Sequence, residues 1–207
     1  MSLLSRLTEK SWQTSAADAG VDPGDYRPPA GQVMLYLYCA VAAMIFLLLV
    51  MAYLMRMEVH AGMGHGPGDW KRMPEPVLLW INTAILMLGS VAWEMARRAA
   101  IAPDSHRRRE TMRFATIVGG LLGIAFLCGQ LVLWRQFQAA GYYLSANPAN
   151  AFFYLLTAIH GLHLIGGIVG WLRVLIRPTP LGVRLCATYW HFLLLVWVLL
   201  AGLLLST

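Results

Sequence analysis

Three histidines lie inside stretches of this chain that are otherwise apolar. His160 and His163 stand three residues apart in TAIHGLHLIGG, and His191 follows in YWHF. Imidazole rings at such positions could ligate haem iron, ligate copper or zinc, or hydrogen-bond between helices. Residues three apart share one face of a helix, so His160 and His163 point in the same direction.

The three alternatives need different neighbours. A haem needs an axial pair from two facing helices, for example His160 or His163 with His191. Copper or zinc could accept all three imidazoles, but no Cys or carboxylate stands beside them to complete a shell or to orient the rings. Structural hydrogen bonding needs only a carbonyl or hydroxyl group on the next helix. The spacing alone favours the structural alternative and leaves the other two open.

A second group of potential metal ligands lies in MRMEVHAGMGHGPGDW. Met57, His60, Met63 and His65 carry the soft or imidazole groups that copper accepts. A flexible, glycine-rich loop does not hold ligands in place, so we expect no metal site there. The three cysteines are far apart in the sequence and indicate no cluster either.

The elements that must position the histidines are membrane spans. Hydrophobic residues make up 58% of the chain and charged residues 13%, with a mean hydropathy of +0.59, whereas soluble domains are about 25% charged. A helix needs about 20 apolar residues to cross a bilayer. The sequence therefore predicts an all-α integral membrane bundle of five transmembrane helices, at residues 33–55, 77–96, 114–134, 151–172 and 188–205.

Residues 1–32 are expected to form a cytoplasmic tail, and residues 33–207 the membrane domain. The tail has no apolar core of signal-peptide length, so the first span must act as its own insertion signal. Leu3, Leu4, Leu7 and Trp12 fall on roughly one helical face, which is compatible with an interfacial helix. A disordered tail is the equal alternative.

The basic residues predict the direction of the spans, because short loops rich in Lys and Arg stay in the cytoplasm. Alternate segments carry 12 and 4 of these residues, with the larger number on the side of the amino terminus. The amino terminus is thus expected in the cytoplasm and the carboxyl terminus in the periplasm. Nucleic-acid binding is a poor interpretation of a short basic loop without aromatic residues. Lipid headgroups are the natural partners of Arg97, Arg98, Arg107 and Arg108.

The other polar residues inside the spans are candidates for helix contacts, because such groups usually face protein or a water-filled cavity. They include Asn82, Thr157 and Glu94. The fourth span is also rich in small residues, which let a second helix approach closely. It is therefore predicted as an interior helix that packs against the fifth span.

The segments AFFYLLTAIHGLHLIGG and ATYWHFLLLVWVLL closely resemble the last two helices of subunit III of the haem-copper respiratory oxidases, which include cytochrome c and quinol oxidases. The resemblance extends to the helix with Asn82, Thr83 and Ser90 and to Gln130, and it covers essentially everything from Val33 onward. The positions in the last two helices that match the family pattern are Phe152, Phe153, Thr157, His160, Gly161, Leu162, His163, Gly166, Trp190, His191, Phe192 and Trp197.

The resemblance implies a non-catalytic subunit of the bacterial inner membrane that holds no haem and no metal. Haem and copper would lie in subunits I and II, and this chain would pack on subunit I. Two spans and then three would form a V whose cleft holds phospholipid, in an oxidase that translocates protons. The resemblance also favours structural, interhelical roles for His160, His163, His191, Trp190, Thr157 and Asn82.

Three departures from the family pattern concern carboxylates within the membrane. The family usually has acidic residues where this chain has Val41, Leu133 and Leu194. Their absence argues against a proton-antenna role within the membrane. A divergent branch is therefore an alternative, either an accessory subunit of a nitric oxide reductase or a subunit of a respiratory supercomplex.

Two rivals come from other classes of protein. A membrane cytochrome b would use the histidines to bind its own haem. A small transporter would use the polar residues within the spans, but the chain has no internal repeat and no broken half-helices. The sequence leaves open the electron donor, the electron acceptor and the oligomeric state.

Overall fold

A computed structural model describes residues 28–62, 76–101, 105–143 and 148–206. The described residues form five helices, each long and apolar enough to cross a membrane. The predicted all-α membrane protein with five spans is therefore confirmed. The helices are α2 (Ala30–Gly62), α3 (Val77–Ala100), α4 (His106–Ala139), α5 (Pro148–Ile176) and α6 (Pro180–Ser206).

The chain divides into two compact units, residues 1–34 and 35–207. The described part of the first unit is residues 28–34, which include the start of α2. Most of the predicted tail, with its candidate interfacial helix, lies outside the described residues. The second unit contains the rest of α2 and all of α3 to α6.

The helices extend beyond the predicted spans at several ends. The largest differences are at the starts of α4 and α6, which begin at His106 and Pro180 although their predicted spans begin at residues 114 and 188. Ser105 caps the start of α4, and its side chain accepts a hydrogen bond from the backbone N–H of Arg108 at 3.3 Å. Pro148 and Pro180 likewise begin α5 and α6, in the position where proline suits a helix. Hydropathy locates the apolar part of a helix, whereas its ends depend on caps.

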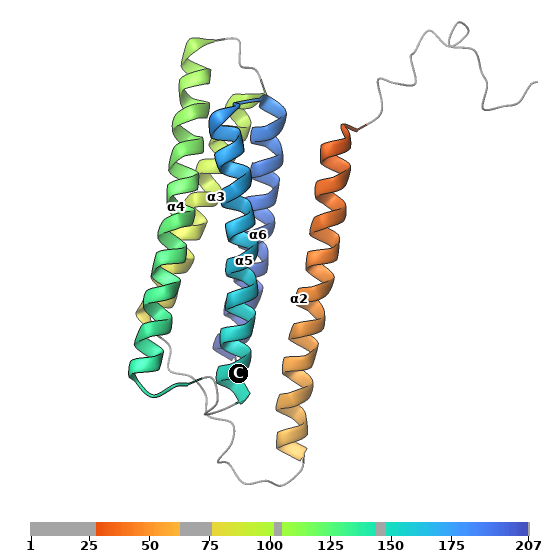
Figure 1. The fold of residues 1–207 in the computed structure, drawn as a ribbon, viewed down its shortest axis with the longest axis vertical. Helices are drawn as coiled ribbons and strands as arrows, with labels where there is room; N and C mark the ends of the chain where they lie inside the picture. The colour runs from red at the N-terminus through yellow and green to blue at the C-terminus, as the bar shows by residue number, and fades with distance from the viewer. Residues whose placement is uncertain (1–27, 63–75, 102–104, 144–147, 207) are drawn as a thin grey trace, which may run out of the picture. The chain divides into compact units, whose positions relative to one another are not determined.

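Four helices pack in a ring. α3 contacts α4 and α6, and α5 contacts the same two helices. Figure 1 shows α3 to α6 side by side along their lengths. These contacts join α3 to α6 into one group of four. The predicted division into two and three helices in a V, and the direction of the spans across the membrane, stay predictions.

Glycines on α4 make room for indole rings from its neighbours. A Cβ atom at Gly120 would overlap the ring of Trp171 on α5, and one at Gly123 would overlap the ring of Trp190 on α6. Such small residues let helices approach closely in membranes. The sequence prediction placed the small-residue surface on the fourth span, α5, but the tightest contacts of this kind lie on α4.

The core of the ring is aromatic. Trp93 of α3 and Trp190 of α6 stack with their ring centroids 5.7 Å apart and an interplanar angle of 18°. Phe126 of α4 meets Trp197 of α6 edge-on at 4.8 Å. All four side chains are at most 1% exposed. Large rigid rings therefore fix the relative positions of α3, α4 and α6.

α2 is much less covered by the rest of the chain. In its most apolar stretch 17% of the residues are buried, against 39% in each of the other four helices. Its buried residues include Phe46, Val50 and Tyr53. The rest of its surface must meet lipid or another protein.

Candidate functional site

His160 is fully buried among aromatic rings. Its ring lies 5.2 Å from that of Trp197 on α6, 5.9 Å from Phe126 on α4 and 6.3 Å from Phe46 on α2, measured between centroids. Neither ring nitrogen has a hydrogen-bond partner among the described residues. The contacts of this imidazole are therefore those of an aromatic side chain, with edges and faces of neighbouring rings.

His163 lies on the same face of α5, one turn further along. Its Nδ1 lies 2.8 Å from the backbone oxygen of Ile159 on its own helix. Its ring lies 5.2 Å from Phe46 and 6.0 Å from Tyr38, both on α2. Tyr189 of α6 donates its hydroxyl to the backbone oxygen of His163 at 2.9 Å. The residue thus connects α5 with α2 through its ring and with α6 through its main chain.

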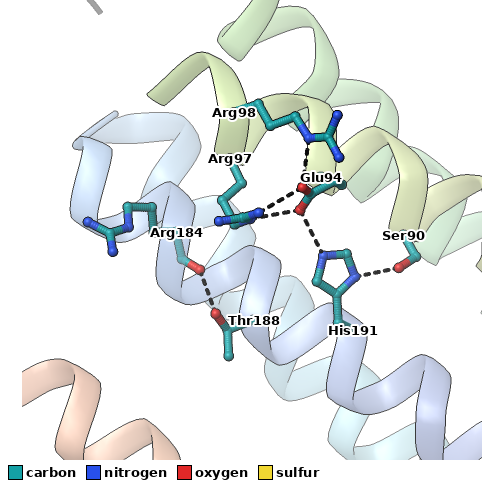
Figure 2. A network of polar contacts seen from close by, with 7 residues as sticks. All are labelled: Ser90, Glu94, Arg97, Arg98, Arg184, Thr188 and His191. Atoms are coloured by element: carbon teal, nitrogen blue, oxygen red, sulfur yellow. Dashed lines mark hydrogen bonds and ion pairs between the residues drawn. The ribbon is translucent and has the colours of Figure 1, made fainter. Parts of the chain in front are cut away.

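His191 is positioned by α6 to face α3. Its Nδ1 lies 2.5 Å from Ser90 Oγ, and its Nε2 lies 3.4 Å from Glu94 Oε2. Figure 2 shows the imidazole between these two side chains. A carboxylate only accepts hydrogen bonds, so Nε2 must carry a hydrogen to donate to Glu94. In the tautomer with its hydrogen on Nε2, Nδ1 accepts the Ser90 hydroxyl, so both nitrogens have partners.

Glu94 is the centre of a charged cluster at this end of α3. Arg97 donates to it twice, from Nε to Oε2 and from Nη2 to Oε1, both at 2.7 Å. Arg98 donates from Nε to Oε1 at 2.8 Å. Such charge-assisted bonds are roughly twice as strong as neutral ones. The Glu94 and His191 side chains remain 25% and 38% exposed, so this network lies at the surface of the ring of helices.

The structure therefore separates the three histidines that the sequence placed together. His160 and His163 share a face against α2, whereas His191 has its partners on α3. Within the part of the chain that the structure describes, no three His, Cys, Asp or Glu residues are grouped so that they could hold a metal ion. The arrangement suits helix association at two separate places.

The Ser90–Glu94–His191 connection was not predicted from the residues. Glu94 was noted only as a polar residue near the end of its span, and Ser90 only through the family resemblance. A signal was available, because Ser90, Glu94 and Arg98 recur at intervals of four and share one helix face. The missing information was that this face meets α6.

The remaining predicted interhelical residues lie between helices. Thr157 of α5 accepts a hydrogen bond from Trp134 Nε1 of α4 at 3.2 Å and donates to the backbone oxygen of Phe153 at 2.6 Å. Asn82 of α3 is fully buried against Gly129 of α4, where a Cβ atom would overlap its amide oxygen. Trp190 fills the space beside Gly123, as described above. Their predicted structural roles await a direct test.

The predicted headgroup residues lie at one end of two helices. Arg97 and Arg98 are in the last turn of α3, and Arg107 and Arg108 are in the first turn of α4. Residues 102–104 between them are outside the described residues. So are the side chains of His60, Met63 and His65, the candidate copper ligands of the first loop.

Comparisons with known proteins agree with these features. The family model for cytochrome c oxidase subunit III matches residues 31–204. A probable cytochrome c oxidase subunit 3 of Nocardia farcinica is 31% identical over 144 residues, which cover 63% of this chain and 68% of the relative. A protein of the same description from Mycobacterium tuberculosis is 28% identical over 144 residues, 64% of this chain and 69% of the relative.

A longer match comes from a cyanobacterium. The cytochrome c oxidase subunit 3 of Synechocystis is 26% identical over 215 aligned residues, which cover 95% of this chain and 88% of the relative. The matched region of the family model includes all of α3, α4 and α5, with the paired histidines, and the YWHF segment of α6. This chain belongs to the cytochrome c oxidase subunit III family.

Proposed function

We propose that this chain is the non-catalytic subunit III of a proton-translocating haem-copper oxidase in a bacterial inner membrane. It packs on subunit I, whose haem and copper, with those of subunit II, carry out the chemistry. The observation that carries this proposal is the family match over residues 31–204, essentially the whole membrane domain. The relatives named above are described as subunits of cytochrome c oxidases.

The exposed apolar surface of α2 is available for a partner in the membrane. Its exposed apolar side chains include Leu37, Val41, Leu48 and Met51. A subunit that docks on a larger neighbour leaves apolar surface of this kind outside its own core. Subunit I and phospholipid are the proposed neighbours of this surface.

The orientation and the lipid contacts complete the proposal. The amino terminus lies in the cytoplasm and the carboxyl terminus in the periplasm, in accordance with the distribution of basic residues. Arg97, Arg98, Arg107 and Arg108 then contact phospholipid headgroups at the cytoplasmic surface. The V-shaped cleft between two and three helices, and membership of a supercomplex, are further parts of this proposal.

The first experiment is co-purification of the tagged chain in mild detergent, with identification of the neighbouring chains and an absorption spectrum. We expect haem-copper oxidase subunits I and II with haem bands that remain with them when this chain is removed. Nitric oxide reductase subunits would indicate the alternative complex. A Soret band that stays with the isolated chain would overturn the proposal in favour of a membrane cytochrome b.

The substitution His163→Leu tests the structural role in the complex. It removes the ring contacts with Phe46 and Tyr38, each of which is worth about 1 kcal/mol. We expect a lower thermal stability or weaker association of the chain, with the haem spectrum of the complex unchanged. Leu162→Ala, at an exposed neighbouring position, is the control. Loss of a haem band in His163→Leu would mean that this residue serves a cofactor.

A further inference from the structure

A groove lies between the first turns of α4 and the turn that joins α5 to α6. Two adjacent hollows share Met112, Arg113 and Pro178. The inner hollow has a volume of about 240 Å³ and the outer one about 540 Å³. The inner one is completed by Thr116, Ile117, Val174, Leu175 and Val183, and the outer one by His106, Arg109, Glu110 and Pro180.

The inner hollow is an apolar slot with a fixed wall. Thr116 donates its hydroxyl to the backbone oxygen of Met112 at 2.7 Å, and Trp171 Nε1 donates to the backbone oxygen of Thr116 at 2.9 Å. These bonds use the hydroxyl proton and the carbonyl of Thr116, and the second one ties α4 to α5. The side chains that line the rest of the slot are aliphatic or Met112, apart from Arg113 at its edge. The slot therefore offers an occupant mainly aliphatic contacts.

The outer hollow is cationic. Arg113 is exposed and, among the described residues, makes no hydrogen bond or ion pair with another side chain. Arg109 adds a second guanidinium group. The only carboxylate in the lining as described is that of Glu110, which lies 3.5 Å from His106 Nδ1. The outer hollow thus has an excess of positive charge beside an apolar slot.

The groove lies at the depth of lipid headgroups. α4 has 34 residues and is about 50 Å long, whereas the hydrocarbon core of a bilayer is about 30 Å thick. The first turns of α4 must therefore extend into the headgroup layer. Arg113 is followed directly by Phe114, which is 68% exposed, so the polar part of the helix gives way to its apolar part at this residue.

We propose that this groove binds one anionic membrane phospholipid, with its phosphate on Arg113 and one acyl chain in the slot. Guanidinium groups match the geometry of phosphate, and the aliphatic side chains of the slot suit an acyl chain. The proposal deepens the lipid-binding part of the proposed function, on which it rests. The site lies between α4, α5 and α6. It is separate from the headgroup contacts proposed at Arg97, Arg98, Arg107 and Arg108.

The test measures lipid binding to the purified full-length chain in detergent by native mass spectrometry. The probes are phosphatidylglycerol and phosphatidylcholine with the same acyl chains, each added separately. Arg113→Gln removes the headgroup ligand, and Arg184→Gln removes the same charge from an exposed position near the start of α6 that lines neither hollow. Leu175→Trp fills the slot without changing charge, and Leu172→Trp is its control, one turn away and outside the slot lining.

We expect the wild-type chain to prefer phosphatidylglycerol. Arg113→Gln should lower its affinity about tenfold, the size of one charge-assisted hydrogen bond, and Leu175→Trp should lower it at least as much. Both controls should stay within about twofold of the wild type, since one exposed charge contributes little. Free glycerol 3-phosphate should not compete, because it has no chain for the slot.

The possible failures are distinguishable. A wild-type chain that bound neither lipid would overturn the lipid-binding part of the proposed function as well as this site, whereas equal binding of the two lipids would overturn this site alone. A preference reduced equally by Arg113→Gln and Arg184→Gln would indicate diffuse attraction and overturn the site alone. An undiminished affinity in Leu175→Trp, with the variant shown to be folded by its circular dichroism, would also overturn it.

Discussion

His160 and His191 are the same residue type in neighbouring helices, but they have different surroundings. His160 is 0% exposed, is enclosed by aromatic rings and has no polar partner among the described residues. His191 lies at the surface of the ring of helices and bonds to Ser90 and Glu94. The first region depends on shape, and the second depends on charge and hydrogen bonds. The presence of a histidine within a membrane span therefore does not by itself determine which kind of contact the side chain makes.

The largest loss of stability is expected from a substitution that overpacks the aromatic core. Gly123→Leu would place a side chain in the space of the Trp190 ring, so the stack with Trp93 could not form. We expect a loss of at least about 3 kcal/mol, the upper end of overpacking costs, measured by thermal unfolding in detergent. Gly202→Leu is the matched control, because nothing lies within 4 Å of a Cβ atom there. Equal stability of the two variants would contradict the tight contact.

A smaller loss of stability is expected at His160, where two substitutions separate the contribution of side-chain shape from that of polarity. His160→Ala leaves a cavity among Phe46, Phe126 and Trp197 and should cost about 2–4 kcal/mol. His160→Leu keeps most of the volume and should cost only about 1 kcal/mol, the value of the lost ring contacts. The measurement is again thermal unfolding of both variants. If Leu proves as damaging as Ala, the imidazole nitrogens have a polar partner and the contrast with His191 disappears.

The smallest effect is expected in the charged network. Glu94→Gln removes the negative charge and replaces one acceptor oxygen by an NH2 group, which cannot accept, so one oxygen remains for the donors of Arg97, Arg98 and His191. Because the network is partly exposed, we expect a cost of about 1 kcal/mol. The difference from wild type should shrink in about 1 M salt, where charges are strongly screened. The deficit of His160→Leu should not change with salt. A salt-independent deficit in Glu94→Gln would remove the distinction between the two regions.

The sequence predicted the part of the fold that follows from composition. All five predicted spans lie within the observed helices, because lipid allows only apolar, internally bonded segments to cross. The early start of α4 was missed because its first turns are rich in arginine and only the cap at Ser105 marks the end. A hydropathy pattern has no signal for such a turn.

The site was predictable only within single helices. The shared face of His160 and His163 followed from their spacing, and both do lie near Phe46. The partners of His191 depend on the packing of α6 against α3, and helix pairs are not fixed by the periodicity of one sequence. The glycines of α4 are visible in the sequence, but the indole rings that fill the space beside them come from three other helices.

The sparse coverage of α2 has a consequence for biogenesis. Most of the side chains in its apolar stretch face away from the rest of the chain, so the helix needs few internal contacts to be stable in lipid. It can leave the translocon alone and early, before its successors are synthesised. α3 is different, because its buried Asn82 packs against Gly129 of α4 and is shielded from lipid only once α4 is in place. We therefore expect α2 to insert independently of the association of α3, α4, α5 and α6.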